Sequence, residues 1–426
     1  MRPGAGHSCG QYRVVRMITD PFAVLVVLTA VVYVSIQLSR NIKVFRALGS
    51  VLVAILLAMA LSNAGLLPDK SPIYEFLAST GVSVAIVLIL LTVDLRSVFS
   101  AGPQMLVAFF IGAVGTVLGA SSAALLLSDS VGPETYKIAG QYTGTYMGGG
   151  VNFAALGEYF ETSSDMFSAA VAADVAITAI WLIACLSIPL LLPRAEHDLG
   201  AVEPESNELT SNITAELSHS NLVLETDLEE VGEEVGATGI SPDLKKSLHS
   251  TINAVSLVEA ATLVMLAVGL VWFADWLAGV VGVPEVLVLT TLVLLVAQIP
   301  AVKELSGSAM WGNYLLHLFL AANGAQSVIA NIFVIGPAVF YFALATVAVH
   351  GIIIFGIGRL AGIDAPTLAV ASQANIGGPA SAMALAGTRG YSHLLLPGIA
   401  VGLLGYAIGN YTGAALGTVI RFYIGG

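Results

Sequence analysis

The chain has 426 residues, of which 57% are hydrophobic and 10% are charged. This composition excludes an ordinary soluble domain, in which about a quarter of the residues are charged. The formal net charge is -12, but residues 193–250 hold 13 of the 28 acidic residues and only 3 of the 16 basic ones. The rest of the chain is nearly neutral, so the acidity says nothing about a cationic substrate. Because no basic patch is present, we expect no nucleic-acid partner.

In chain order, ten apolar runs approach or reach the roughly 20 residues that cross a hydrocarbon core of ~30 Å. They are residues 21–38, 45–61, 74–93, 105–127, 167–192, 255–278, 286–299, 315–332, 337–357 and 394–420. Two further apolar segments, near residues 136–156 and 365–385, are interrupted by glycines. The sequence therefore predicts an all-α polytopic membrane protein of about 12 segments. We expect an integral, multi-pass protein of the cell (plasma, or inner) membrane.

The pattern divides the chain into four regions. They are an N-terminal tail at residues 1–19, a first membrane repeat at 20–192, an acidic flexible linker at 193–250 and a second membrane repeat at 251–426. The linker composition cannot bury enough apolar area to offset chain entropy. Met17 stands just before the first apolar run, which leaves open whether residues 1–16 belong to the native protein.

Counting crossings from the first run sorts the basic residues of the loops onto two sides. One side would hold Arg40, Lys43, Arg46, Arg96 and Arg389, and the positive-inside rule makes that side cytoplasmic. The other side would hold Lys303 and Arg359, together with Arg13 and Arg16.

The two interrupted segments are similar to each other and indicate an internal repeat. The first reads TYMGGGVNFAAL from residue 145 and the second reads ANIGGPASAMAL from residue 374, and one constant offset aligns Gly148-Gly149 with Gly377-Gly378. In lipid, broken backbone survives only where it is buried in protein or lines a cavity. Paired breaks at matching positions of two halves indicate the binding site of a secondary transporter. An inverted repeat needs an odd number of crossings between equivalent helices, whereas this count is six, so a parallel repeat stays open.

The breaks and the polar residues around them are the candidate substrate or ion site. A broken helix exposes carbonyl oxygens at one half-helix end and amides at the other, and nearby side chains add ligands. The candidates are Thr145, Tyr146, Gly148, Gly149, Asn152, Gln373, Asn375, Gly377, Gly378, Ser381 and Asn410. The alternative is packing, because glycines and small polar residues also let membrane helices approach closely.

Asp174 lies at the centre of an otherwise apolar run, with Thr178 one helical turn later on the same face. An aspartate near the bilayer centre is costly unless it is solvated or paired, so we expect Asp174 and Thr178 to bind the coupling ion. The alternative is a structural acid, protonated or paired, near a helix end.

Other residues have simpler readings. A stripe of glycines from Gly398 to Gly417 predicts a tightly packed face on the last helix. Asp94 and Arg96 suggest a mutual ion pair or a helix cap, and His317 and His350 suggest packing residues rather than proton relays. Motifs of hydrolases, metalloproteases and phosphate-binding loops are missing, so we expect no enzyme and no cofactor.

These motifs resemble a known family. The residues that carry the resemblance are Val93-Asp94-Leu95-Arg96, GGGVN from residue 148, Ala173-Asp174 and ANIGGPA from residue 374. They are similar to the YjcL-like multispanning membrane proteins, a domain of unknown function. That family is distantly similar to the cation–proton antiporter and bile-acid:sodium symporter superfamily. The resemblance implies a panel domain and a core domain in which two broken helices cross at mid-membrane, and it implies no substrate. Antiporters of that superfamily often have Asn-Asp or Asp-Asp where this chain has Ala173-Asp174, and this departure argues against carrying over sodium–proton exchange from the resemblance.

The leading hypothesis is a secondary active transporter that moves a small solute or ion by symport or antiport, with proton or sodium coupling and rocking of a core domain. We expect no bound metal ion other than a possible sodium ion. The alternative is a channel-like or non-transporting membrane module whose acidic linker binds a partner. For the transporter hypothesis, the expected partners are the lipid bilayer and the substrate, and a homodimer is left open.

Overall fold

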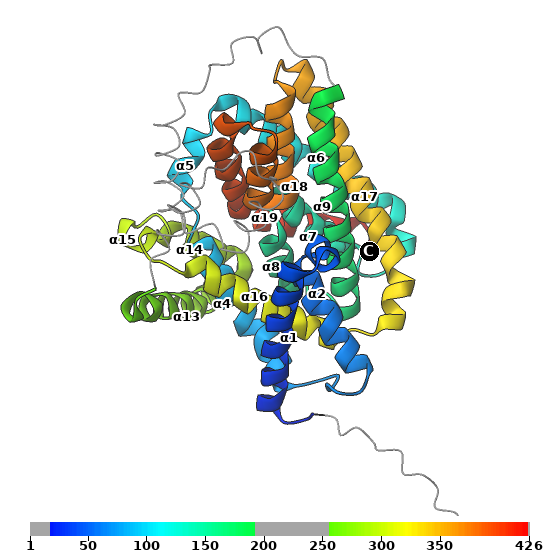
Figure 1. The fold of residues 1–426 in the computed structure, drawn as a ribbon, viewed down its shortest axis with the longest axis vertical. Helices are drawn as coiled ribbons and strands as arrows, with labels where there is room; N and C mark the ends of the chain where they lie inside the picture. The colour runs from blue at the N-terminus through cyan, green and yellow to red at the C-terminus, as the bar shows by residue number, and fades with distance from the viewer. Residues whose placement is uncertain (1–17, 192–254, 425–426) are drawn as a thin grey trace, which may run out of the picture.

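The computed structural model describes residues 18–191 and 255–424. The predicted linker, the possible extension at residues 1–16 and most of the predicted tail lie outside these residues. Within them the chain is helical and contains no strand (Figure 1). The elements are α1 (Pro21–Asn41), α2 (Lys43–Asn63), α3 (Pro72–Phe76), η1 (Leu77–Gly81), α4 (Val82–Leu90), α5 (Leu95–Ser100), α6 (Pro103–Val131), α7 (Thr135–Gly148), α8 (Gly150–Tyr159), α9 (Ser164–Leu191), α13 (Leu257–Val281), α14 (Glu285–Val296), α15 (Pro300–Lys303), α16 (Ser308–Ala325), α17 (Ile329–Leu360), α18 (Ala365–Thr388), η3 (Ser392–Leu394) and α19 (Leu395–Ile424).

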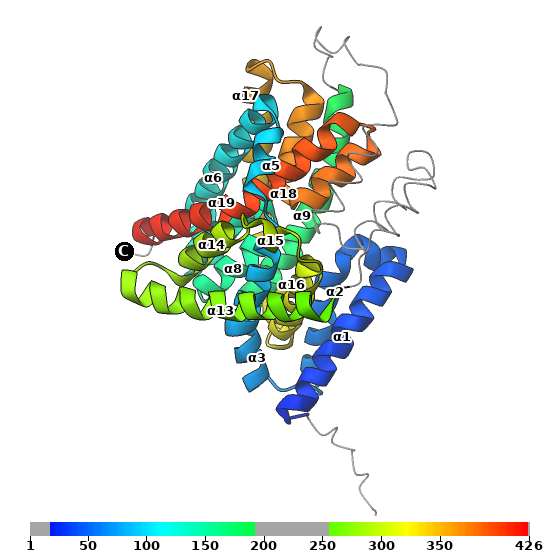
Figure 2. The same ribbon diagram turned by 90° about the vertical axis from the view of Figure 1, so that its left-hand side faces the viewer.

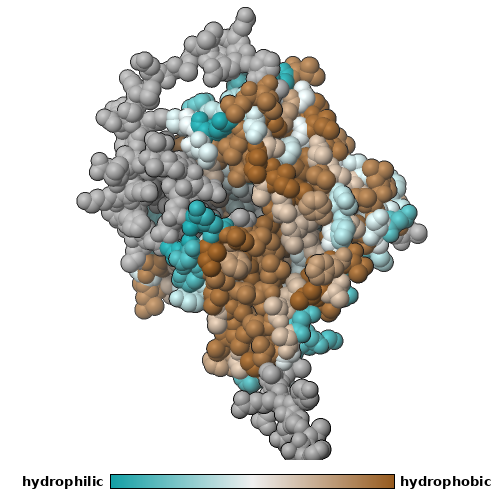
Figure 3. Space-filling model, turned by 45° about the vertical axis from the view of Figure 1, so that its right-hand side comes forward, coloured by the Kyte–Doolittle hydropathy of each residue, from teal (hydrophilic) through white to brown (hydrophobic). Residues whose placement is uncertain are grey.

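Seven of these helical stretches are long and apolar enough to cross a membrane, and two shorter apolar helices accompany them. Large hydrophobic side chains on their outer faces are strongly exposed, among them Leu126, Val334 and Phe422. Figure 3 shows hydrophobic residues over most of one face, with hydrophilic residues in small patches. Such a surface suits lipid rather than water. The count of about twelve segments stays a prediction.

Local sequence signals explain where the helices begin. Asp20, Asp94 and Asp364 each accept a hydrogen bond from a backbone N–H of the first turn that follows. Ser256 and Glu259 form a capping box at the start of α13. The predicted run at residues 315–332 is wrong in its bounds, because α16 ends at Ala325 and α17 begins at Ile329. Only three residues, Gln326, Ser327 and Val328, separate the two helices, and this interruption is too short for hydropathy to locate.

Contacts between helix ends define a first side of the molecule, which we call the Arg96 side. Gln298, just beyond α14, bonds the backbone of Val93 and Leu95 beyond α4 (3.0 and 3.1 Å). The Ser308 hydroxyl at the start of α16 donates to the Leu88 carbonyl (2.6 Å). Thus α4 and α14 end, and α6 and α16 begin, on the side of Arg96.

Helix α17 runs antiparallel to α6 and therefore ends on the Arg96 side. A Cβ atom on Gly112 would lie 3.0 Å from Ile354, and Gly119 meets the backbone of Thr346 further along both helices. The Arg389 guanidinium, just after α18, donates to the Leu186 carbonyl near the end of α9.

The opposite end, which we call the Lys137 side, is held by polar contacts. The Asn63 amide at the end of α2 donates to the Ser327 carbonyl (2.9 Å), and the Ser327 hydroxyl donates to the Ser164 carbonyl at the start of α9 (2.9 Å). The Lys137 ammonium of α7 donates to the Glu161 carbonyl just beyond α8 (2.7 Å).

In Figures 1 and 2, α1 and α13 occupy the lower part of the molecule and α6 and α18 the upper part.

Candidate functional site

The first glycine break separates α7 from α8 at Gly149. Its φ of 106° and ψ of -179° lie in a region that suits glycine. After the break α8 returns beside α7, since the Gln141 amide donates to the Phe153 carbonyl (3.2 Å) and Lys137 reaches Glu161. The two helices form a re-entrant hairpin that enters and leaves on the Lys137 side.

The second break lies inside α18 at Gly378, where φ is 77° and ψ is -168°. A Cβ atom on Gly398 would lie 2.6 Å from the Val370 side chain before the break and 3.3 Å from Ala382 after it. In an unbroken helix, residues 12 apart would be separated by about 18 Å. The two arms of α18 therefore also fold back on each other, and both end on the Arg96 side.

These hairpins differ from the predicted broken helices that cross the membrane. The same difference makes the predicted sides of two basic residues wrong. Lys303 forms an ion pair with Asp94 (2.5 Å) and therefore lies on the same side as Arg96. Arg359 follows it to that side, at the end of α17. The prediction counted each broken segment as a crossing, whereas each segment returns to the side from which it came.

The tips of the two hairpins meet inside the protein. A Cβ atom on Gly378 would lie 2.8 Å from the Gly148 carbonyl oxygen, and one on Gly149 would lie 3.5 Å from the Gly378 α-carbon. Only residues without side chains allow the two backbones this close approach. The structure therefore brings together Gly148, Gly149 and Gly378, with Gly377 next to them.

The glycine stripe of α19 holds the hairpins in place, as the sequence predicted. Gly402 packs on Pro379, Gly405 on the backbone of Met147 and Gly148, and Gly409 on Asn152. A larger residue at any of these three positions would push the hairpins away from α19.

Most of the predicted polar residues are buried around the tips, and several of their atoms have no hydrogen-bond partner. Thr145, Asn152, Gln373, Asn375 and Asn410 are all 0% exposed. The unpartnered atoms around the tips are Thr145 Oγ1, Asn152 Oδ1, both amide atoms of Gln373 and both amide atoms of Asn375, and Asn410 Oδ1 is unpartnered elsewhere. A buried polar group without a partner costs about 1–3 kcal/mol, so this concentration calls for a ligand.

The individual placements differ. The Asn152 amide donates to the carbonyls of Gly144 (3.2 Å) and Gly405 (3.1 Å) and so also has a packing role. Ser381 is half-buried, and its hydroxyl lies with the Gln373 amide beside Gly377. Asn410 is not brought to the tips, since its amide donates to Thr290 on α14 (3.0 Å).

Asp174 lies on α9 beside the first hairpin. It is half-buried, and the Thr178 hydroxyl reaches its carboxylate at 3.5 Å, as the one-turn spacing suggested. The Tyr146 ring stacks on Tyr142 with centroids 5.4 Å apart, and both tyrosines lie near Asp174. The Tyr146 hydroxyl faces this carboxylate without a well-formed hydrogen bond. Asp174 is thus linked to the tip region through Tyr146.

A chain of hydrogen bonds that the sequence did not reveal connects the two hairpins through His350 of α17. His350 Nδ1 lies 2.9 Å from the Gly112 carbonyl, which can only accept, so Nδ1 carries the proton. In the neutral ring, Nε2 then accepts from the Ser372 hydroxyl (2.9 Å), which in turn accepts from the Trp181 indole N–H (2.9 Å).

On its other side, His350 Nδ1 lies 3.0 Å from the hydroxyl of Thr116, which donates to the Tyr146 carbonyl (2.8 Å). Neutral His350 thus satisfies a network from the first hairpin to the second. The sequence pattern singles out His350 but not its partners, because Thr116, Ser372 and Trp181 lie in other helices. His317 bonds Ser50 (2.9 Å) and the Asn313 carbonyl (2.8 Å), as expected of a packing residue.

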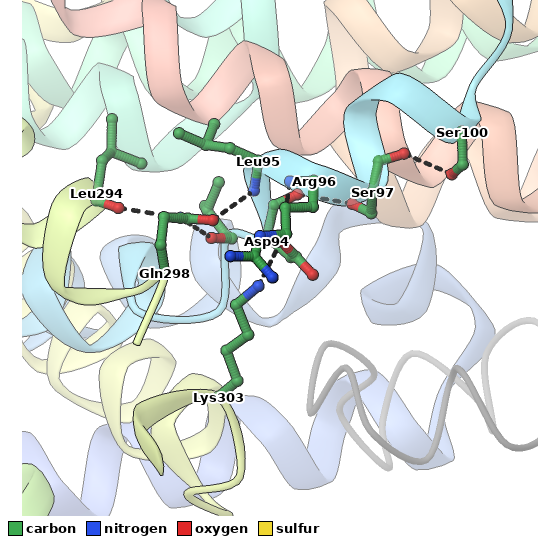
Figure 4. A network of polar contacts seen from close by, with 9 residues as sticks. Asp94, Leu95, Arg96, Ser97, Ser100, Leu294, Gln298 and Lys303 are labelled. Atoms are coloured by element: carbon green, nitrogen blue, oxygen red, sulfur yellow. Dashed lines mark hydrogen bonds and ion pairs between the residues drawn. The ribbon is translucent and has the colours of Figure 1, made fainter. Parts of the chain in front are cut away.

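Asp94 has a capping role, and its ion-pair partner is Lys303 rather than the predicted Arg96 (Figure 4). Burial alone would raise the Asp94 pKa. The hydrogen bonds from Lys303 and from the Arg96 backbone N–H together lower it by more than burial raises it, so the pKa lies below its ordinary value. This network lies at the helix ends of the Arg96 side.

The exposed apolar helices and the buried hairpins define an integral, multi-pass membrane protein. The chain belongs to the family described as "Protein of unknown function (DUF819)", whose model matches residues 23–423. It is 31% identical over 386 residues to the "Uncharacterized membrane protein YjcL" of Bacillus subtilis (strain 168), which covers 90% of this chain and 93% of the relative. The resemblance to YjcL-like proteins is therefore confirmed.

Proposed function

We propose that this protein is a secondary active transporter of a small solute or ion. The observation that carries the proposal is the meeting of two re-entrant hairpins whose buried tips leave side-chain nitrogen and oxygen atoms unpartnered. Irregular backbone at membrane depth is tolerated where it is buried or lines a site. A permanent structural role would pair these atoms within the protein, whereas a ligand that comes and goes pairs them only while it is bound.

The chemistry of the tips suits a solute with both donors and acceptors. Gln373 and Asn375 each offer an amide nitrogen and an amide oxygen. At each tip one helix ends and another begins, so carbonyl oxygens and backbone amides face the same place. The carbonyl ends favour a cation, and the amide ends favour an anionic group.

Asp174 is the proposed coupling residue, with Thr178 as a second oxygen ligand. Its carboxylate can hold a proton or a sodium ion, and its link to Tyr146 connects that charge to the first tip. Binding of the coupling ion would then alter the tip at which the solute binds.

We also infer that the two halves form an inverted repeat. When the hairpins are not counted as crossings, the first half contributes α1, α2, α3–α4, α6 and α9, and the second contributes α13, α14, α16, α17 and α19. Five crossings per half is an odd number, so the second half begins on the opposite side from the first. This topology supports alternating access to a shared site.

The direct test is uptake into proteoliposomes that contain the purified protein. Solute accumulation should collapse when the proton and sodium gradients are dissipated. Because a ligand that binds only the folded protein raises its thermal midpoint, a screen of solutes at several pH values and sodium concentrations identifies what to test. Solute flow that stays passive under every gradient would contradict the proposal and favour a channel.

A further inference from the structure

A pocket of about 560 Å³ opens on the Arg96 side between α5, α15 and α19. Arg96, Ser97 and Lys303 lie at its rim, where Figure 4 shows Asp94 bonded to Lys303. Leu396 and Leu403 of α19 line its wall. The pocket is therefore lined by charged and polar side chains together with apolar side chains of α19.

The pocket and the hairpin tips are both lined by helix α19. Leu403 directly follows Gly402, which packs on Pro379 at the tip of the second hairpin. A movement of α19 would therefore alter both the pocket and the packing of the tips.

On the Lys137 side, the start of α9 is tied to the turn between α16 and α17. The two carboxylate oxygens of Asp165 accept from the Val328 backbone N–H and the Asn331 amide, both at 2.6 Å. The Ser168 and Ser327 hydroxyls are bonded to each other at 2.8 Å, and both residues are buried. We call this contact between Asp165, Ser168, Ser327, Val328 and Asn331 the α9 latch.

The pocket and the α9 latch occupy related places in the two halves. The same offset that aligns Gly149 with Gly378 also places α9 on α19, and places the turn after α16 on α5. Leu396 on the pocket wall then corresponds to Phe167, which is buried and packs against Phe319 with ring centroids 5.6 Å apart. The Arg96 side thus has a pocket at the position where the Lys137 side has a hydrogen-bonded contact.

We propose that the pocket is the vestibule through which solute reaches the hairpin tips from the Arg96 side, and that the α9 latch is the closed gate on the Lys137 side. The inference rests on the proposed transport function. It adds that this structure represents the conformation open to the Arg96 side and closed to the Lys137 side. Opening of the latch and closure of the pocket would expose the same tips to the other side of the membrane.

The charge distribution identifies the two sides. Among the described residues, seven Lys or Arg residues lie on the Arg96 side and three on the Lys137 side. The first set is Arg40, Lys43, Arg46, Arg96, Lys303, Arg359 and Arg389, and the second is Lys70, Lys137 and Arg421. By the positive-inside rule the vestibule opens to the cytoplasm.

Labelling with a membrane-impermeant maleimide tests the vestibule. A Cys9→Ser parent retains only buried Cys185 and serves as the blank. Leu396→Cys in this parent should react in inside-out vesicles and not in intact cells. Ser168→Cys should stay unreactive from both sides.

The Asp165→Asn substitution, made in both the Leu396→Cys and the Ser168→Cys protein, tests the latch. Asparagine has one side-chain oxygen in place of two, so it cannot accept both the hydrogen bond from the Val328 N–H and the one from the Asn331 amide. We expect Ser168→Cys to become several-fold more reactive from outside, and Leu396→Cys to become less reactive from inside. Glu161→Gln is the matched control, since it removes an exposed carboxylate that precedes α9 by one turn, and it should change neither rate.

The outcomes separate this inference from the proposed function. Equal labelling of Leu396→Cys from both sides, or no effect of Asp165→Asn on either rate, would overturn the vestibule and latch. Asymmetric labelling in a protein that shows no coupled uptake would overturn the transport proposal and leave the accessible pocket and the latch in place.

Discussion

The two hairpin tips share a backbone shape but differ in how their side chains are used. Gly149 and Gly378 have similar positive-φ conformations with extended ψ, at matching positions of the two halves. In the first hairpin, the Asn152 amide is committed to the carbonyls of Gly144 and Gly405. In the second, Gln373 and Asn375 have no hydrogen bonds from their side-chain amides. We infer that the first hairpin is chiefly a support and that the second supplies most of the solute contacts.

The largest expected effect comes from closing the space between the tips. Gly378→Leu should abolish transport, because the new Cβ would clash with the Gly148 carbonyl and the positive φ disfavours a side chain by about 1–2 kcal/mol. Gly279→Leu is the matched control, because nothing lies within 4 Å of a Cβ atom there. Proteoliposome uptake, with folding checked by size-exclusion chromatography, measures the difference. Full uptake by Gly378→Leu would remove the tips from the site.

The comparison of the two hairpins predicts opposite effects for their amides. Asn375→Ala should weaken solute binding by about five- to tenfold without loss of stability, since a lost hydrogen bond is worth about 1–1.5 kcal/mol and no protein partner is deprived. Asn152→Ala should lower the thermal midpoint, because it removes the hydrogen bonds that tie Asn152 to the carbonyls of Gly144 and Gly405. Ligand titration and thermal unfolding of both variants test this. If Asn375→Ala were the less stable of the two, the division of roles would be wrong.

Asp174→Asn tests the coupling site beside the first hairpin. The amide keeps the shape of the side chain but cannot titrate, so the protein should fold while uptake loses its dependence on the proton or sodium gradient. Asp129→Asn, on the polar end of α6, is the control acid. Thermal midpoints of both variants with sodium and pH varied provide a readout independent of uptake. Unchanged ion dependence in Asp174→Asn would make Asp174 structural.

The smallest effect is expected at the pocket rim, far from both tips. Because the Asp94 pKa is lowered in the folded protein, the ion pair with Lys303 stabilises the fold above the ordinary aspartate pKa. This stabilisation is lost as the pH falls through the lowered pKa, and partial exposure limits it to about 1 kcal/mol or less. Thermal midpoints of wild type and Asp94→Asn should differ slightly at neutral pH and converge in acid. A constant difference down to acid pH would show that the carboxylate charge does not matter.

The sequence alone determined the membrane class, the positions of the two breaks and the packing face of α19. These features depend on local chemistry: apolar runs demand lipid, paired glycines relax the backbone, and glycines at helical spacing form a flat face. The one-turn pairing of Asp174 with Thr178 likewise follows from helical spacing.

Only the tertiary structure decided whether each broken segment crosses the membrane or turns back. The glycines at Gly149 and Gly378 permit either path, and packing of each returning arm against its partner and against α19 selects the hairpin. That choice moves Lys303 to the side of Arg96 and joins it to Asp94, although the two residues lie in different halves of the chain. It also leaves Gln373 and Asn375 without partners, because hydrogen bonds between distant segments depend on three-dimensional packing that spacing in one dimension does not encode.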